Sequence, residues 1–103
     1  MLFFLKNNIA FANKAPETFA LYQNVPNPFK EQTVIGFDVP SDGSTTLSIF
    51  DVTGKLVLKN IYEFEQGYQE VIIRKSDLDQ TGVLYYQIEN GDFTATRKMI
   101  LID

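Results

Sequence analysis

Residues 82–102 read Gly82-Val-Leu-Tyr-Tyr-Gln-Ile-Glu-Asn-Gly-Asp-Phe-Thr-Ala-Thr-Arg-Lys-Met-Ile-Leu-Ile102, two apolar-rich runs on either side of Asn90-Gly91. Asn-Gly between such runs is the strongest short signal for a β-hairpin, because both central positions of a type I′ turn need positive φ. We therefore predict a hairpin with strands at 82–89 and 93–102. We expect Asn90 and Gly91 in the central positions of its turn.

Upstream of this hairpin, apolar residues recur at every second position between turn residues. Short alternating runs with turns roughly every ten residues are typical of an all-β sandwich. The predicted strands are 19–24, 33–39, 45–50, 55–63, 68–74, 82–89 and 93–102. Residues 75–80 are polar and predict one helical turn or a loop. The fold class is all-β, an immunoglobulin-like antiparallel β-sandwich of about seven strands.

The stretch Asp51-Val-Thr-Gly-Lys55 predicts a second hairpin. The Asp51 carboxylate is suited to capping a tight turn, and Gly54 supplies the positive φ of a hairpin closed by a bulge. Near the start of the domain, Pro26 and Pro28 lack N–H donors and exclude this stretch from a central strand.

The composition limits both size and function. The 103 residues suit one domain, and the 45% hydrophobic share suits a folded core. A net charge of -4 with scattered basic residues argues against nucleic acid and against an anionic membrane surface. No run approaches the roughly 18 apolar residues of a membrane-spanning helix. We predict no membrane insertion.

The first eighteen residues differ from the rest. Met1–Leu5 is an apolar run that ends at Lys6, which is too short for the core of a secretory signal peptide. Residues 10–18 are small and polar, as in an extended linker. We therefore divide the chain into 1–18, a remnant of an upstream region with a linker, and the domain 19–103.

No pattern in the chain predicts catalysis, and no cofactor is expected. Histidine and cysteine are absent, which removes the usual general base, the commonest metal ligand and the thiolate nucleophile. The acidic residues fall mostly in turns or on polar strand faces, which favours a solvated surface. A calcium site from Asp77, Asp79 and the Gln80 carbonyl stays a less favoured alternative, because no twelve-residue calcium loop is present.

The five tyrosines suggest either core positions or a platform on which sugars stack. Tyr85 and Tyr86 are neighbours in one predicted strand and point to opposite faces, so we expect at least one of them in the core.

Four segments together resemble the type A C-terminal sorting domains of type IX secretion cargo. They are Leu21-Tyr-Gln-Asn-Val-Pro-Asn-Pro-Phe29 with the strand after it, Leu47-Ser-Ile-Phe-Asp-Val-Thr-Gly-Lys55, Asp79-Gln-Thr-Gly-Val-Leu-Tyr-Tyr-Gln-Ile88 and Thr94-Ala-Thr-Arg-Lys-Met-Ile-Leu-Ile102. Their order and spacing are more specific than any one of them. In the family one residue usually separates Gly from Tyr, whereas Val83 and Leu84 both follow Gly82. The extra residue changes which of the two tyrosines faces inward. We therefore expect Tyr86, and not Tyr85, to take the place of the family's tyrosine.

The resemblance implies that this domain is a secretion signal and not an enzyme. Its partners would be an N-terminal cargo domain, the type IX outer-membrane translocon and a sortase-like peptidase that cuts in or just before residues 10–18. The cargo would pass through the periplasm to the cell surface or the medium. The residues proposed for recognition are Pro26, Asn27, Pro28, Phe29, Asp51, Gly54, Lys55, Gly82, Tyr85, Tyr86, Arg97 and Lys98.

A second function stays open at this point. A sandwich of this kind could be an accessory binding module of the immunoglobulin or fibronectin type that binds carbohydrate or protein, because the fold alone does not decide function. An exposed row of coplanar tyrosines would favour this alternative.

Overall fold

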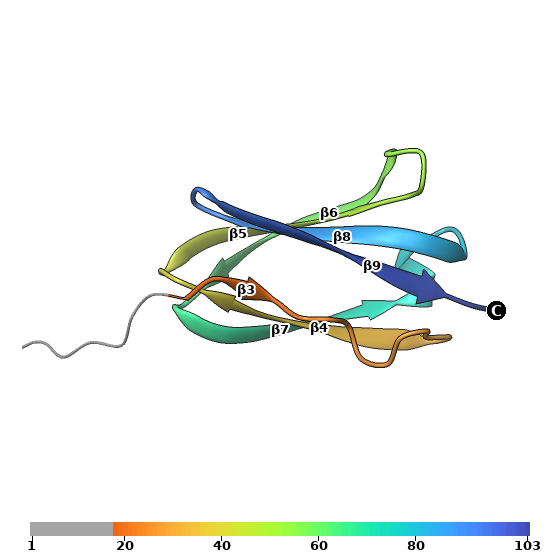
Figure 1. The fold of residues 1–103 in the computed structure, drawn as a ribbon, viewed down its shortest axis with the longest axis horizontal. Helices are drawn as coiled ribbons and strands as arrows, with labels where there is room; N and C mark the ends of the chain where they lie inside the picture. The colour runs from red at the N-terminus through yellow and green to blue at the C-terminus, as the bar shows by residue number, and fades with distance from the viewer. Residues whose placement is uncertain (1–17) are drawn as a thin grey trace, which may run out of the picture.

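A computed structural model describes residues 18–103 as two antiparallel sheets packed face to face (Figure 1). The three-stranded sheet has the order β3 (Ala20–Leu21), β4 (Gln32–Val39) and β7 (Gly67–Arg74). The four-stranded sheet has the order β6 (Leu56–Phe64), β5 (Gly43–Phe50), β8 (Gly82–Asn90) and β9 (Phe93–Leu101). The predicted all-β sandwich of seven strands is confirmed.

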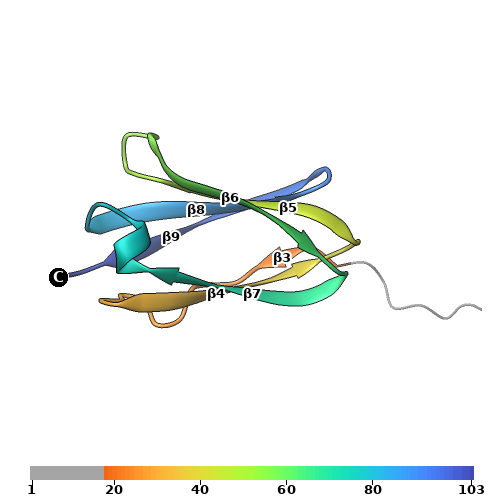
Figure 2. The same ribbon diagram turned by 180° about the vertical axis from the view of Figure 1, so that it is seen from behind.

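The strand order follows an immunoglobulin-like plan. In immunoglobulin letters the sheets are A-B-E and C′-C-F-G, because β6 joins the sheet of β5, β8 and β9. For each predicted strand after the first, both bounds lie within two residues of those of an observed strand. The predicted helical turn is the 3-10 helix η1 (Lys75–Asp77), which joins β7 to β8 and is visible in Figure 2. Within residues 18–103 no helix is long and apolar enough to cross a bilayer.

The core lies between the two sheets and is built by residues at alternate strand positions. On β4, Ile35, Phe37 and Val39 are buried, as their alternation predicts. On β5, Leu47 and Ile49 are buried and contribute to the same core cluster. One continuous apolar core therefore joins the two sheets, and burial of this kind is the dominant favourable term in folding.

The last hairpin has its turn one residue later than predicted. Asn90 pairs with Phe93, so Gly91 and Asp92 occupy the central positions, and Gly91 has a φ of 60°. Asn90 instead ends β8 with only 3% of its surface exposed. Its amide donates to Thr45 Oγ1 at 3.0 Å, and this buried contact explains the shift.

The first strand is also shorter than predicted. Only Ala20 and Leu21 pair with β4, and Val25 returns as an isolated bridge to Val34. The described chain begins at one end of the sandwich, while the C-terminus leaves at the other end (Figure 1). The predicted linker and upstream remnant lie outside the described residues, except for Thr18.

Candidate functional site

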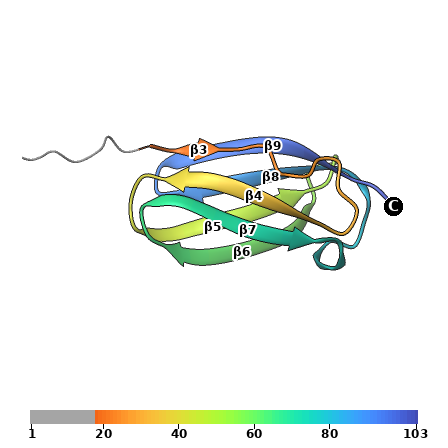
Figure 3. The same cartoon turned by 90° about the horizontal axis from the view of Figure 1, so that it is seen from below.

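Residues 21–29 lie along the free edge of β9, and we call this contact the edge seam. Figure 3 shows β3 beside β9 along one long side of the sandwich. Since Asn90 and Phe93 close a two-residue turn, alternate residues of β9 direct their backbone groups to β8. The residues between them, Thr94, Thr96, Lys98 and Ile100, direct their N–H and C=O groups to the free edge.

The stretch 26–29 covers the last part of this edge. Phe29 N donates to the Ile100 carbonyl at 3.0 Å, and Ile102 N donates to the Phe29 carbonyl at 2.9 Å. The Asn27 side chain accepts from Ile100 N at 2.9 Å. The Phe29 side chain is 1% exposed and belongs to the core. Residues far apart in sequence thus form one unit at the C-terminal end of the sandwich.

The two prolines form the exposed part of this loop. The Val25-Pro26 and Asn27-Pro28 peptide bonds are both cis. The Pro26 carbonyl accepts from Thr33 Oγ1 at 2.8 Å and from the Asn24 amide at 3.1 Å. The loop is therefore braced from inside, while Pro26, Asn27 and Pro28 remain exposed on the outside.

Tyr86 fastens the other half of the seam from the core. Its side chain is fully buried, and its hydroxyl donates to the Tyr22 carbonyl at 2.7 Å and accepts from Asn24 N at 2.9 Å. Burial raises the pKa of this phenol, so the hydroxyl stays a donor at neutral pH. Tyr85 is 37% exposed on the opposite face. The prediction that one of the pair is in the core is confirmed.

Arg97 and Lys98 are both exposed, but of the two side chains only that of Arg97 forms a hydrogen bond within the described residues. Arg97 Nε donates to the Leu21 carbonyl at 2.6 Å and so joins β9 to β3. For Lys98, the backbone carbonyl accepts from the Gln23 side chain at 2.8 Å. Its ammonium group has no salt bridge among the described residues. A cation is thus presented beside the seam.

The Asp51–Lys55 hairpin lies apart from the seam, although Figure 1 places it at the same end of the sandwich. Asp51 Oδ1 accepts from Thr53 N, Thr53 Oγ1 and Lys55 N at 2.8, 2.6 and 3.0 Å. The Thr53 hydroxyl lowers the pKa of the carboxyl below its usual range. Gly54 has a φ of 87°, as predicted for this turn, and the β5–β6 register shifts at Ile49/Phe50.

The remaining predicted residues flank the seam. Gly82 begins β8 opposite Leu101, which is itself bridged to Phe29. Tyr85 pairs with Lys98, so these two share the outer face of the four-stranded sheet. Of the predicted residues, those at 26–29, 86, 97 and 98 meet at the seam, those at 82 and 85 lie next to it on β8, and those at 51, 54 and 55 lie apart from it.

Sequence analysis missed three residues that hold the seam. Asn24 is 1% exposed and Thr33 is fully buried, and the Asn24 amide donates to Thr33 Oγ1 at 3.0 Å. Gln23 bonds across to β9. The sequence did contain a signal, because the polar residues Asn24 and Thr33 stand on either side of the two prolines. Such side chains can donate to loop carbonyls that have no partner in a neighbouring strand.

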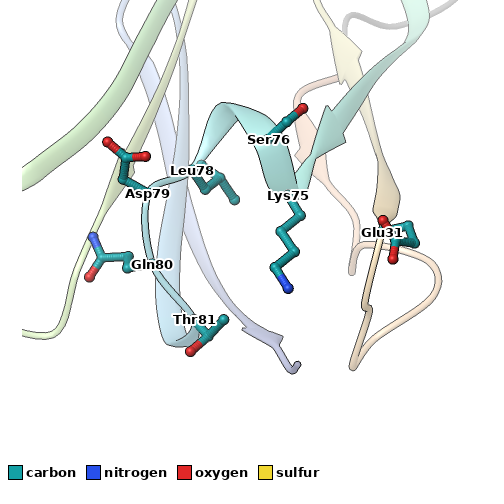
Figure 4. A pocket seen from close by; sticks show the side chains of 7 residues that line it. All are labelled: Glu31, Lys75, Ser76, Leu78, Asp79, Gln80 and Thr81. Atoms are coloured by element: carbon teal, nitrogen blue, oxygen red, sulfur yellow. The ribbon is translucent and has the colours of Figure 1, made fainter.

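The acidic residues of the described part of the chain stay apart from one another. No group of three or more Asp or Glu residues could hold a metal ion there. Asp77, a candidate calcium ligand, accepts from Arg74 N at 3.0 Å and so caps its own turn. The hollow near Asp79 has Glu31 on its opposite side (Figure 4), and Lys75 in it pairs with Asp103 at 3.7 Å.

The tyrosines do not form one row on one face. Tyr22 and Tyr68 are neighbours on the outer face of the three-stranded sheet, but their rings are tilted by 46°. Tyr85 lies on the other sheet, Tyr86 is core and Tyr62 is partly buried against the core. The arrangement lacks the coplanar platform that would favour the carbohydrate-binding alternative.

Comparisons with known proteins place most of the chain in one family. Residues 24–102 match the family model described as the secretion system C-terminal sorting domain. No curated protein matches the chain.

Among solved structures, the chain is similar to dimeric latent PorU from Porphyromonas gingivalis, with a TM-score of 0.61 and 19% sequence identity. That match covers 86% of this chain and 10% of the PorU chain. At this identity the likeness shows the fold alone. The family match covers most of the chain, and the chain therefore belongs to the secretion system C-terminal sorting domains.

Proposed function

We propose that this domain is the address by which an N-terminal cargo is carried through the type IX outer-membrane translocon. The match over residues 24–102 supports this function most directly. In this proposal the cargo crosses the periplasm and ends at the cell surface or in the medium. A sortase-like peptidase removes the domain by cutting in or just before residues 10–18.

The edge seam is the surface that we propose for recognition. It combines a braced, exposed proline loop with the exposed ammonium group of Lys98, and both lie beside a strand edge. Thr94 and Thr96 direct backbone groups outward at this edge, and no hydrogen bond to them from residues 21–29 is present among the described residues. An edge of this kind can accept a strand from a receptor.

A fusion experiment tests the function itself. Residues 19–103 are fused behind a periplasmic fluorescent protein in a host that has the translocon, and fluorescence is measured in the medium and on the cell surface. Export that depends on the translocon supports the proposal. Fluorescence that stays in the periplasm, with the domain folded, contradicts it.

Lys98→Ala separates recognition from folding, because no hydrogen bond or salt bridge of the Lys98 ammonium group is present among the described residues. We expect an unchanged melting temperature and several-fold weaker export. Lys59→Ala is the matched control, since Lys59 is an exposed cation on β6 at the opposite edge of the same sheet. Equal export by both variants would remove Lys98 from the recognised surface.

A further inference from the structure

The outer face of the three-stranded sheet carries a hollow next to the edge seam, on the side of residues 22–25 that faces away from β9. Its volume is about 340 Å³, at the low end for pockets that bind small groups. Figure 3 views the sheet from this side. The hollow is lined by Tyr22, Gln23, Val25, Val34, Gly36, Tyr68 and Glu70. Tyr22, Val25 and Tyr68 are 43%, 67% and 56% exposed, which is unusual for such side chains gathered on one face.

Gly36 makes room for one of the two rings. A Cβ added at Gly36 would lie 2.2 Å from the Tyr68 hydroxyl oxygen, so the ring occupies the space of the missing side chain. The Tyr22 and Tyr68 ring centroids are 6.0 Å apart. The hollow therefore has aromatic walls that lie close to the sheet.

Both phenols give their hydrogen to a carboxylate. The Tyr22 hydroxyl donates to Asp38, and the Tyr68 hydroxyl donates to Glu70 at 2.9 Å. These carboxylates raise the pKa of both phenols, so the hydroxyls keep their protons at neutral pH. The phenols have no second hydrogen to donate. The groups that can contact a ligand are therefore the carboxylate oxygens, which accept hydrogen bonds, and the faces of the tyrosine rings.

Neither Asp38 nor Glu70 forms a salt bridge within the described chain. The salt bridge between Lys75 and Asp103 involves neither Asp38 nor Glu70. A phosphate or another anion is disfavoured by this charge. The surface instead favours a cation that also has apolar contact area.

We propose that this hollow binds an arginine side chain of a protein partner. A guanidinium group stacks on a tyrosine face and gives several N–H donors to carboxylates in the same plane. Val25 and Val34 supply apolar contact for its aliphatic stem. A lysine ammonium is more strongly hydrated and lacks the planar face. The site shares Tyr22, Gln23 and Val25 with the edge seam but opens on the outer face of the three-stranded sheet, and this inference does not rest on the export function.

The test is a titration of the isotope-labelled full chain with N-acetyl-arginine amide, followed by amide chemical shifts. We expect saturable shifts confined to residues 20–25, β4 and β7. N-acetyl-citrulline amide, which has nearly the same shape without the charge, should produce no saturable shifts. Similar saturation by citrulline, shifts elsewhere on the domain or no response to arginine would each overturn the proposal.

Two variants test the site without cutting into the core. Glu70→Gln removes one exposed carboxylate, and Gly36→Ala moves the Tyr68 ring at a position where β-strand backbone accepts alanine. Each should weaken arginine binding up to about fivefold, the upper range for one exposed ion pair in Glu70→Gln and for one exposed cation–π contact in Gly36→Ala. Glu89→Gln is the matched control, because Glu89 is exposed on the other sheet. Equal weakening by the control would also contradict the assignment.

Discussion

Replacing Tyr86 with phenylalanine tests how much the edge seam contributes to folding. The substitution keeps the ring in the core and removes only its hydroxyl. That hydroxyl accepts from Asn24 N at 2.9 Å and donates to the Tyr22 carbonyl at 2.7 Å. No cavity of the size of a side chain is formed, so the hydrogen bonds are the main change.

The expected loss follows from the groups left without a partner. Asn24 is 1% exposed, and a buried donor that loses its acceptor costs about 1–3 kcal/mol. The Tyr22 carbonyl is only partly buried and regains water more readily. We expect Tyr86→Phe to lower the free energy of unfolding by about 2 kcal/mol. For a domain of this size that is a drop of roughly 8–16 °C in melting temperature.

Thermal and urea unfolding measure this loss, and hydrogen exchange locates it. The backbone N–H of Asn24 should lose protection from exchange in Tyr86→Phe before the backbone N–H groups of β5 do. Tyr85→Phe is the control, because its hydroxyl is on the exposed face one residue away. The reasoning fails if Tyr86→Phe stays within about 0.5 kcal/mol of the parent, the range of neutral surface changes. It also fails if the control loses as much.

Further predictions concern pH and the second hairpin. The raised pKa of Tyr86 contributes stability that is present below about pH 10 and is lost as the pH rises through the folded pKa. The difference in free energy of unfolding between the parent and Tyr86→Phe, measured with urea, should therefore shrink in strong alkali. The lowered pKa of Asp51 contributes stability above about pH 3.8 that is lost as the pH falls through the folded pKa; Asp51→Asn should flatten the acid limb of the stability curve. Gly54→Ala should cost about 1 kcal/mol in thermal unfolding, because φ is 87° there, whereas Val52→Ala in the same exposed turn should be near neutral.

The faces of the strands were predictable because one physical rule decides them. Successive side chains of a strand alternate between two faces, so Ile35, Phe37 and Val39 had to be buried together once one of them was. The same rule separated Tyr85 from Tyr86. Local turn chemistry likewise predicted Gly54, since positive φ selects glycine.

The displaced turn at Asn90 shows where local rules stop. Asn-Gly favours a type I′ turn, but here Asn90 is buried against Thr45 on another strand. A contact between residues so distant in sequence has no local signature. Tertiary burial therefore outweighed the local turn preference and moved the turn by one residue.

The edge seam was predictable in part of its residues but not in its assembly. The proline loop and the basic pair of β9 were both singled out, yet nothing in either stretch indicates that Asn27 accepts from Ile100 N. The pairing depends on which backbone groups of β9 face away from β8, and this is settled by the closing pair at Asn90 and Phe93. A shift of one residue would direct the other set of groups to the loop.

The same dependence gives the proposed address a property that a linear motif lacks. The loop residues and Lys98 are adjacent only when β9 is paired with β8 and Tyr86 holds the chain from inside. A receptor that contacts both would therefore bind the folded domain and pass over an unfolded one. Tyr86→Phe should then lower export in proportion to the unfolded fraction, whereas Lys98→Ala should lower it with the domain fully folded. Equal export of unfolded chains would show that the receptor reads a linear segment.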